Sequence, residues 1–413
     1  MKNKFLQEMQ SRGYLNQCTD LSSLEEVFNK QSVIAYIGFD CTASSLHVGS
    51  LLQIMVLRLM QKHGHKPVVL LGGGTTLIGD PSGKDTTRKL LNQKEIKNNI
   101  KNIKKVFSKI LDTSTNKTKP IFVNNFDWLS KLNYIEFLRD VGSHFTINKM
   151  LTFDSIKLRL EREQSLSYME FNYMILQAYD FYELFKNKKC ILQIGGSDQW
   201  GNIVNGVELI RRKLKKESYG LTTPLITLAS GAKMGKTEKG AVWLNENLFS
   251  AYDYWQFWRN SDDRDIKRFL NFFTEIDTDE INELCNSEKD INKLKVMLAN
   301  EATKILHGKS ATAKAEKTAK ETFESGGIGI DLPEIKIKEN DLKKGLKILD
   351  LLSSNKIMPS KSEARRAIKS KAIKLNNEIL IDENKLIQLN DFGNNRLLKI
   401  SFGKKKHYII KFI

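Results

Sequence analysis

A tyrosine, an aspartate and a histidine come close together near the start of the chain, where a strand is expected to lead into a helix. Residues 36–50 read Tyr-Ile-Gly-Phe-Asp-Cys-Thr-Ala-Ser-Ser-Leu-His-Val-Gly-Ser. Tyr36, Gly38 and Asp40 alternate along the expected strand, so their side chains share one face. His47 and Gly49 come at the helix start, where free backbone N–H groups and the helix dipole favour a phosphate. The imidazole can donate to a phosphate oxygen and the glycine lets a nucleotide approach, so this run predicts a nucleotide site.

The elements that position this run form a βαβ unit. Residues 51–60 are apolar nearly all round, which predicts a buried helix. Gly64 is a plausible stop, and a second strand is expected at 66–71. Strand, helix and strand in that order give parallel strands, with the helix start at the carboxyl end of the sheet. Short apolar strands and helices continue to about residue 230, so we predict an α/β fold with a Rossmann-like, doubly wound parallel sheet.

A glycine-rich turn follows the second strand and ends in Gly-Asp-Pro-Ser-Gly-Lys at 79–84. It is not a phosphate-binding P-loop, because Gly79 is one residue too close to Gly83 and Asp85 stands where Ser or Thr is required. We expect these glycines to let backbone and ligand come close, with Asp80 facing the crevice.

Three further segments carry polar side chains that could serve a ligand. Tyr173, Gln177 and Asp180 stand at i, i+4 and i+7 of an apolar helix, so they point the same way. Buried polar groups need partners, and the alternative to a ligand pocket is an internal hydrogen-bond cluster. Residues 194–202 form a glycine-containing turn from strand to helix. In residues 231–240 two lysines three residues apart, Lys233 and Lys236, lie among glycines, which suits a mobile clamp on a triphosphate or an ordinary surface loop.

Composition limits the class of protein. The chain has 413 residues, 40% of them hydrophobic, which is enough for two to four domains. No run approaches the 18 or so apolar residues of a membrane span, and the first residues lack the apolar core of an export signal. The four cysteines are far apart and form no Cys-x-x-Cys pair, which argues against a zinc site or a disulfide framework and favours the cytoplasm.

The formal charge of +18 is concentrated at the end of the chain, where residues 346–413 have 15 Lys or Arg against 6 Asp or Glu. This predicts a polyanionic partner, although a soluble, lysine-rich surface is the plain alternative. Ser360 and Glu363 have capping-box spacing before a helix to residue 371, and a strand, an Asn-rich turn and a strand follow at 374–380. That helix carries four basic residues: Arg365, Arg366, Lys369 and Lys371.

These motifs resemble a known family. His-Val-Gly-Ser at 47–50 resembles the HIGH signature of class I aminoacyl-tRNA synthetases, and the whole run 36–50 resembles the bacterial tyrosyl-tRNA synthetases. Residues 231–240 resemble the KMSKS loop, and 360–380 resemble the S4 RNA-binding domain. Five matching segments occur in family order between residues 36 and 237. The chain departs from the class-wide pattern at three positions: Ser50, Gly235 and Thr237.

The resemblance implies activation of L-tyrosine by ATP, with Mg²⁺ on the phosphates and no metal bound by the protein, and then transfer to tRNA(Tyr). It implies a homodimer without a membrane partner. The expected domains are 1–247 (catalytic), 248–325 (helical, anticodon arm), 326–345 (linker) and 346–413 (small α+β, S4-like). The implied catalytic residues are His47, Lys233 and Lys236. Those implied for tyrosine are Tyr36, Asp80, Tyr173, Gln177, Asp180 and Gln199. Those implied for ATP are Gly38, Asp40, His47, Gly49, Gly196, Asp198, Lys233, Lys236 and Thr237. The basic helix, with Arg365, Arg366, Lys369 and Lys371, is implied for RNA.

Two alternatives belong beside this interpretation. The related tryptophanyl enzymes are disfavoured by the Tyr36/Asp180 pair and by the S4-like tail. An RNA-binding protein on a synthetase scaffold that no longer charges tRNA is disfavoured because His47, Lys233, Lys236 and Asp180 are all present.

Overall fold

The computed structural model describes residues 1–81, 91–231, 234–237, 240–323, 332, 334–343, 345–355, 357–393, 396–403 and 406–412. The chain forms two compact units, Met1–Phe249 with Phe257–Leu306, and Ser250–Gln256 with His307–Ile413. In the described part of the chain, no helix has both the length and the apolar character needed to cross a membrane.

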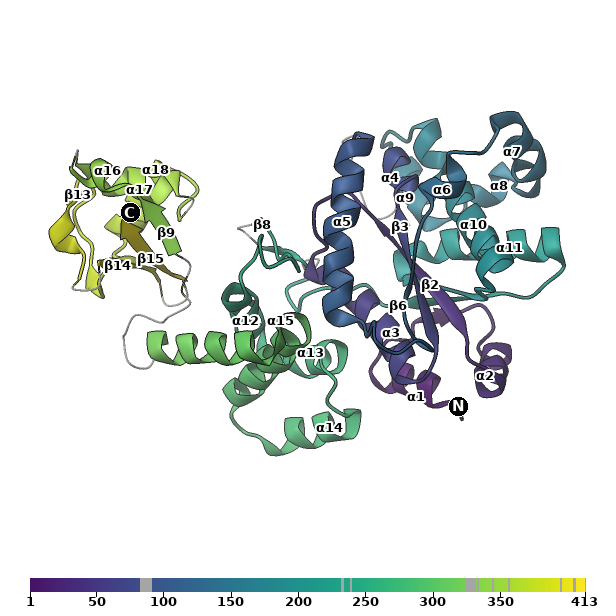
Figure 1. Ribbon diagram of the computed structural model, residues 1–413, viewed down its shortest axis with the longest axis horizontal. Helices are drawn as coiled ribbons and strands as arrows, with labels where there is room; N and C mark the ends of the chain where they lie inside the picture. Colours follow the sequence, from purple (N-terminus) through teal and green to yellow (C-terminus); the bar gives the residue numbers. More distant parts are fainter. Residues whose placement is uncertain are drawn as a thin grey trace. The chain divides into compact units, whose positions relative to one another are not determined.

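A six-stranded sheet organises the first unit (Figure 1). Its order is β1-β6-β5-β2-β3-β4, and it winds outward in both directions from β2. The pairs among β2 to β6 are parallel, whereas β1 joins the edge antiparallel. The doubly wound parallel sheet predicted from the sequence is therefore confirmed. The strands are β1 (Gln17–Cys18), β2 (Ile34–Asp40), β3 (Lys66–Gly72), β4 (Ile121–Asn124), β5 (Leu192–Gly196) and β6 (Tyr219–Thr223).

Helices cover both faces of this sheet. On one face, Tyr36 packs with Phe181 of α10 (Tyr168–Lys188) and Ile210 of α11 (Trp200–Leu214). On the other, Phe39 meets Phe107 of α5 (Gln93–Ile110) edge to face. The alternation along β2 thus puts Tyr36 and Phe39 on opposite faces, as the strand period of two requires.

The predicted βαβ unit is present. A 3-10 turn, Val48–Ser50, precedes α3 (Leu51–Lys62), which is buried on nearly all sides, and Gly64 follows with φ +79°. Asn92 and Glu95 form a reciprocal capping box at the start of α5, and Ser167 and Glu170 form one at the start of α10. The other helices of this region are α1 (Lys4–Ser11), α2 (Leu21–Lys30), α4 (Thr75–Ile78), α6 (Phe126–Leu129), α7 (Tyr134–Asp140), α8 (Ile147–Met150) and α9 (Asp154–Glu161).

From residue 251 to residue 323 the chain is mainly helical, as predicted for 248–325. A short hairpin precedes this segment: β7 (Lys236–Thr237) and β8 (Gly240–Ala241). The helices are α12 (Ala251–Arg259), α13 (Ile266–Phe273), α14 (Thr278–Ser287) and α15 (Ile291–Phe323). Helix α15 is interrupted at Gly308, beside the division between the two units. The expected domain boundaries at 247/248 and 325/326 differ from this division and stay predictions.

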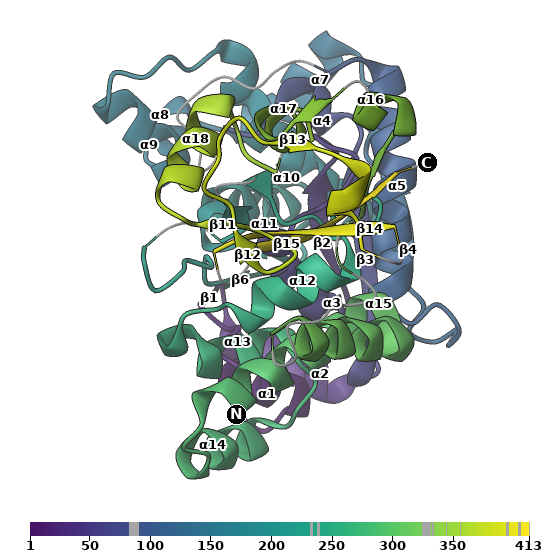
Figure 2. The same cartoon turned by 90° about the vertical axis from the view of Figure 1, so that its left-hand side faces the viewer.

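The second unit contains a sheet of order β12-β11-β14-β15-β9, with α17 and α18 packed over a shared apolar core. Figure 2 shows its long strands β14 (Leu397–Phe402) and β15 (Lys406–Phe412). The predicted hairpin is β11 (Ile373–Leu375) and β12 (Glu378–Ile379), joined by Asn376 and Asn377 at positive φ. The other elements are β10 (Leu346–Lys347), β13 (Leu386–Ile387), α17 (Ile348–Ser354) and α18 (Lys361–Lys369).

The prediction of a linker at 326–345 is wrong for those of its residues that the structure describes. That part contains β9 (Glu334–Ile337), which pairs in parallel with β15, and α16 (Glu339–Lys343). The charged composition favoured a linker, but Ile335 and Ile337 alternate with charged residues and pack into the core of the second unit. The alternation of apolar and charged residues, which is typical of a strand, is therefore a better guide to this segment than its polar composition.

Candidate functional site

A pocket of about 290 Å³ opens at the carboxyl ends of the parallel strands of the first unit. This is the crevice in which open α/β sheets bind ligands. The predicted site residues that line it are Tyr36, Gly38, Asp40, Gly49, Asp80, Tyr173, Gln177, Asp180, Gly196, Asp198 and Gln199. The structure therefore brings together residues separated by as many as 163 positions in the sequence.

One part of the pocket wall is built around Asp180, which is 1% exposed. Asn125 Nδ2 donates to its Oδ2 at 2.9 Å, and Trp128 Nε1 donates to its Oδ1 at 2.7 Å. Burial raises the pKa of Asp180 to about 7, although these two hydrogen bonds act to lower it. The carboxyl group is therefore poised between its two protonation states near neutral pH.

Tyr36 belongs to the same wall. Burial, and then the charge of Asp180, raise the pKa of Tyr36 well above its usual value, so its hydroxyl keeps its proton. The Tyr36 hydroxyl is buried and has no hydrogen-bond partner among the described residues. An orphaned polar atom of this kind is costly unless a ligand satisfies it.

Asp40, at the end of β2, is held from two sides. Tyr173 Oη donates to its Oδ2 at 3.2 Å and Thr75 Oγ1 donates to its Oδ1 at 2.9 Å. A Cβ on Gly72 would lie 2.4 Å from Asp40 Oδ1, so this position requires glycine. The glycines of the turn that follows β3 were expected to let a ligand come close. Gly72 and Gly73 instead leave room for the side chains of Asp40 and Asn124.

A chain of amides crosses the pocket between α10 and α11. Gln199 Nε2 donates to Asp80 Oδ2 at 2.9 Å, and Asn202 Nδ2 donates to both Gln199 Oε1 and Gln177 Oε1 at 3.0 Å. Both alternatives for the polar stripe on α10 thus hold in part: its residues line a pocket and also bond internally. Asp80 faces this pocket, as predicted.

His47 stands beside the pocket rather than in its lining. Its Nδ1 accepts from the Gly49 N–H at 3.0 Å, so a neutral ring carries its proton on Nε2. Backbone hydrogen bonds join Leu46 and Val48 to Leu244 and Val242, and these place Gly235 against the His47 ring. Gly235 has φ +106°, and a Cβ there would lie 2.6 Å from His47 Nδ1. Glycine is therefore required at this departure from the class-wide loop.

The lysine loop is described only in part. Lys233 lies outside the described residues, and Lys236 and Thr237 are described by the backbone of β7 alone. The predicted roles of these three side chains stay predictions.

Sequence reasoning missed several residues of the pocket. Thr75, Asn125 and Trp128 hold Asp40 and Asp180, while Gln53 and Gln193 line the pocket directly. Asn125 directly follows β4, at the same sheet edge as Asp40, so the rule for carboxyl ends of parallel strands could have found it. Trp128 lies in a one-turn helix that carries no pattern of its own.

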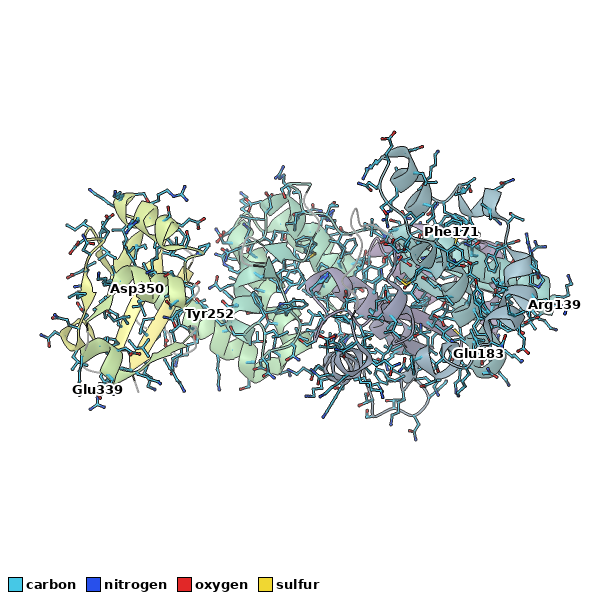
Figure 3. The ribbon with its side chains drawn as sticks, turned by 90° about the horizontal axis from the view of Figure 1, so that it is seen from above. Arg139, Phe171, Glu183, Tyr252, Glu339 and Asp350 are labelled. Atoms are coloured by element: carbon cyan, nitrogen blue, oxygen red, sulfur yellow. The ribbon has the colours of Figure 1, made fainter. Side chains whose placement is uncertain are left out.

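The four basic residues predicted for RNA are exposed on and just after α18 of the second unit. Lys369 lies 3.7 Å from Glu383, whereas Arg365 and Arg366 form no ion pair with any residue that the structure describes. The acidic residues labelled in this unit in Figure 3, Glu339 and Asp350, pair with Lys343 and Lys361. The guanidinium groups of α18 are thus presented to solvent.

Comparisons with known proteins show which family the chain resembles. Residues 29–324 match the family model of class I tRNA synthetases (W and Y), and residues 323–410 match the C-terminal domain model of tyrosine–tRNA ligases. Tyrosine–tRNA ligase from Pelagibacter ubique is 60% identical over 411 residues and covers 100% of both chains. The enzyme of that name from Rickettsia prowazekii is 51% identical and covers 98% of this chain and 99% of the relative.

Among solved structures, a C-terminally truncated mitochondrial tyrosyl-tRNA synthetase from Aspergillus nidulans has a TM-score of 0.70 and 29% sequence identity. The match covers 78% of this chain and 95% of that one.

Proposed function

The chain belongs to the tyrosyl-tRNA synthetase family of class I aminoacyl-tRNA synthetases, and from this premise we propose which side chains perform the ligation of tyrosine to tRNA. The enzyme joins L-tyrosine to ATP to give tyrosyl-adenylate and pyrophosphate, and then transfers the tyrosyl group to the terminal adenosine of tRNA(Tyr). Its relatives are tyrosine–tRNA ligases, so neither the tryptophanyl alternative nor the non-charging one is supported.

The observation that carries the assignment of residues is that Asp180 and Tyr36 line the same pocket and that the buried Tyr36 hydroxyl lacks a partner among the described residues. A carboxylate has about four acceptor positions, and Asn125 and Trp128 use two of them. The phenolic hydroxyl of the substrate donates to Asp180 and accepts from the Tyr36 hydroxyl, which satisfies the orphaned buried group.

The α-ammonium group of tyrosine needs acceptors and negative charge. Asp80 supplies the charge, and Tyr173, Gln177 and Gln199 supply polar atoms around it. These residues come from three segments of the chain, so binding fixes the carboxylate of tyrosine in one place. Fixed geometry is the main source of rate in a displacement that uses no enzyme nucleophile.

Adenylate formation is an attack by the tyrosine carboxylate on the α-phosphate of ATP, with pyrophosphate leaving. Gly49 and the backbone N–H groups at the start of α3 face the nucleotide, together with Gly38, Asp40, Gly196 and Asp198. His47 donates from Nε2 to a phosphate oxygen, and Lys233, Lys236 and Thr237 act on the departing pyrophosphate. ATP enters as its Mg²⁺ complex, in which the ion neutralises phosphate charge.

The second unit binds tRNA. Arg365, Arg366, Lys369 and Lys371 form an exposed basic surface suited to phosphates. We also propose a cytoplasmic location, where tRNA is charged and where the four free cysteines stay reduced.

We propose a homodimer through the surface of α7, α8, α9 and the start of α10 in the first unit. Eight large apolar side chains there are at least 36% exposed: Tyr134, Ile135, Leu138, Ile147, Leu151, Leu158, Leu160 and Tyr168. Figure 3 shows Arg139 of α7 at the outer margin of this region. An apolar surface this extensive is typical of an interface, and a twofold axis lets the same surface cover itself. Light scattering of Ile135→Glu with Ile147→Glu should give a monomer.

Tyrosine-dependent exchange of pyrophosphate into ATP tests the proposed site. The wild-type chain should catalyse exchange with tyrosine and not measurably with tryptophan. Exchange that is equally fast with tryptophan would contradict the assignment of Tyr36 and Asp180.

A further inference from the structure

Helix α5 has a buried apolar face and an exposed face of lysines. Figure 1 shows this helix lying along the sheet of the first unit, and its Phe107 packs on Phe39 of β2. Six lysines of α5 are exposed: Lys94, Lys97, Lys101, Lys104, Lys105 and Lys109. At 3.6 residues per turn, they lie within an arc of about 140° and extend over about 22 Å, so they form one stripe, the lysine row.

The lysine row accounts for much of the positive charge outside the C-terminal region. Residues 346–413 hold +9 of the total charge of +18, which leaves +9 for residues 1–345. Helix α5 has six lysines and one glutamate, so +5 of that remainder falls within 18 residues. The glutamate, Glu95, is used locally, because its side chain accepts from the Asn92 N–H in the capping box. The row is therefore a second concentration of positive charge, in the first unit.

The lysines of the row lack the acidic neighbours that lysines on other helices have. Lys30 and Lys320, for example, each pair with a glutamate four residues away. In the row, Lys109 pairs with Glu246, and the other five form no ion pair with any residue that the structure describes. Their neighbours three or four positions away are mostly lysines, and like charges at this spacing destabilise a helix. A surface that serves solubility alone mixes both signs of charge, so the row calls for a separate explanation.

A narrow row of cations on a straight helix fits a linear polyanion. Asn98 and Ser108 are exposed in the same helix, and their side chains can also donate to phosphate oxygens. An acidic membrane would call for apolar anchors beside the cations, but the large apolar residues of α5 are buried or half-buried. A protein partner is disfavoured, because lysine is depleted in protein interfaces. The phosphodiester backbone of RNA is the partner that fits best.

Helix α5 also lies near the edge of the sheet where the pocket opens. Asn99, on the buried face of the helix, donates from Nδ2 to the Cys41 carbonyl oxygen at 2.9 Å. Cys41 directly follows β2, whose carboxyl end lines the pocket. Two sources of RNA are compatible with this position: the tRNA whose 3′ end enters the pocket, and a second RNA.

We propose that the lysine row of α5 is a second RNA-binding surface of this chain, which binds a phosphodiester backbone independently of α18. This surface goes beyond the function proposed above, because the row contains none of the residues assigned there to the pocket, the lysine loop or the basic helix. Each phosphate that the row neutralises releases condensed counterions, so the bound RNA should be lost as the salt concentration rises.

RNA binding by the full-length chain with Arg365→Ala and Arg366→Ala tests the row without the contribution of α18. The probes are tRNA(Tyr) and an RNA duplex of unrelated sequence. Adding Lys97→Gln, Lys101→Gln and Lys105→Gln, the row triple, should reduce the slope of log affinity against log salt by about two to three. Lys101→Gln alone should reduce it by about one. The melting temperature should not fall, because glutamine suits a helix and the repulsion between like charges is removed.

The matched control is Lys4→Gln with Lys30→Gln and Lys267→Gln. It removes the same charge from exposed lysines on three separate helices, α1, α2 and α13, and should leave the slope unchanged. An equal reduction by both triples, or no reduction by the row triple with either probe, would overturn the proposal. A loss of binding by the row triple that is seen with phosphatidylglycerol vesicles and with neither RNA would also overturn it.

Charging assays in the otherwise wild-type chain separate the two sources of RNA. If the tRNA being charged occupies the row, the row triple should raise the KM for tRNA and leave pyrophosphate exchange at the wild-type rate. If a second RNA occupies the row, the KM for tRNA should stay unchanged although the slope for binding falls. Either result supports the row as an RNA-binding surface and names its occupant.

Discussion

The phenol end of the pocket depends on two side chains whose contributions can be measured separately. Tyr36→Phe removes the buried hydroxyl but keeps the ring that packs on Phe181. The preference for tyrosine over phenylalanine, as a ratio of kcat/KM values, should fall roughly tenfold, about 1–1.5 kcal/mol for one neutral hydrogen bond. Tyr14→Phe is the control, since that hydroxyl bonds the Phe272 carbonyl oxygen and should affect stability only. An unchanged preference in Tyr36→Phe would remove Tyr36 from the site.

Asp180 makes the same preference depend on pH. Burial raises the pKa of Asp180 to about 7, so the carboxylate gains a proton as the pH falls through 7. A neutral carboxyl makes a weaker bond to the phenol than a carboxylate does, by about 1–1.5 kcal/mol. The ratio of kcat/KM for tyrosine to that for phenylalanine should therefore fall about fivefold between pH 8 and pH 6. The ratio cancels groups that act equally on both substrates, and Asp180→Asn should make it independent of pH.

At the scale of elements, helix α6, which follows β4, affects the pKa of Asp180 although it does not line the pocket. Trp128→Phe keeps an aromatic ring in α6 and removes the N–H that bonds Asp180 Oδ1. A hydrogen bond to a charged group is worth about 1.5–3 kcal/mol, so the pKa of Asp180 should rise by at least about one unit. The midpoint of the pH dependence described above should move upward by the same amount.

Trp200→Phe removes an indole N–H from the start of α11, outside the pocket lining, and should leave that midpoint in place. If Trp128→Phe has the same midpoint as wild type, the indole N–H does not affect the pKa of Asp180, and the ring contributes packing alone.

The elements that sequence could predict are those with one strong periodicity. Helix α3 is apolar nearly all round and α10 has polar residues on one stripe, so both helices were predicted, and for α10 the residues that line the pocket were predicted as well. The roles of Tyr36, Asp80 and Asp180 came from resemblance to a family, because spacing alone does not say which buried groups meet. Asn125, Trp128 and Gln53 were missed because their partners are 55, 52 and 170 positions away.

At the scale of the whole molecule, the ligand pocket and the concentrated positive charge lie in different units of the chain. The pocket belongs entirely to the first unit, whereas half of the excess positive charge lies in residues 346–413. The charge distribution along the sequence predicted that the basic region is separate from the pocket. The prediction of where the second sheet begins was wrong. Strand β9 contributes one edge of that sheet from residue 334 onward, so a clean cut must come before it.

A shortened chain that ends at Phe323 should therefore activate tyrosine but charge tRNA poorly. It keeps every residue of the pocket and α15, and it lacks β9, the rest of the C-terminal sheet and the basic helix α18. Pyrophosphate exchange should proceed at the wild-type rate, since that reaction needs no tRNA. The kcat/KM for tRNA should fall by several orders of magnitude, because most of the side chains that bind phosphate are removed.

The full-length pair Arg365→Ala with Arg366→Ala tests the same surface without removing a domain. Affinity for tRNA should fall, and the slope of log affinity against log salt should flatten by about one for each phosphate that is no longer neutralised. Lys336→Ala with Lys338→Ala is the matched control, because it removes the same charge from exposed positions on and beside β9 rather than from α18. If both pairs change the slope equally, the second unit attracts tRNA by its net charge, and α18 is not a specific contact surface. A change confined to the α18 pair would place the tRNA backbone on that helix.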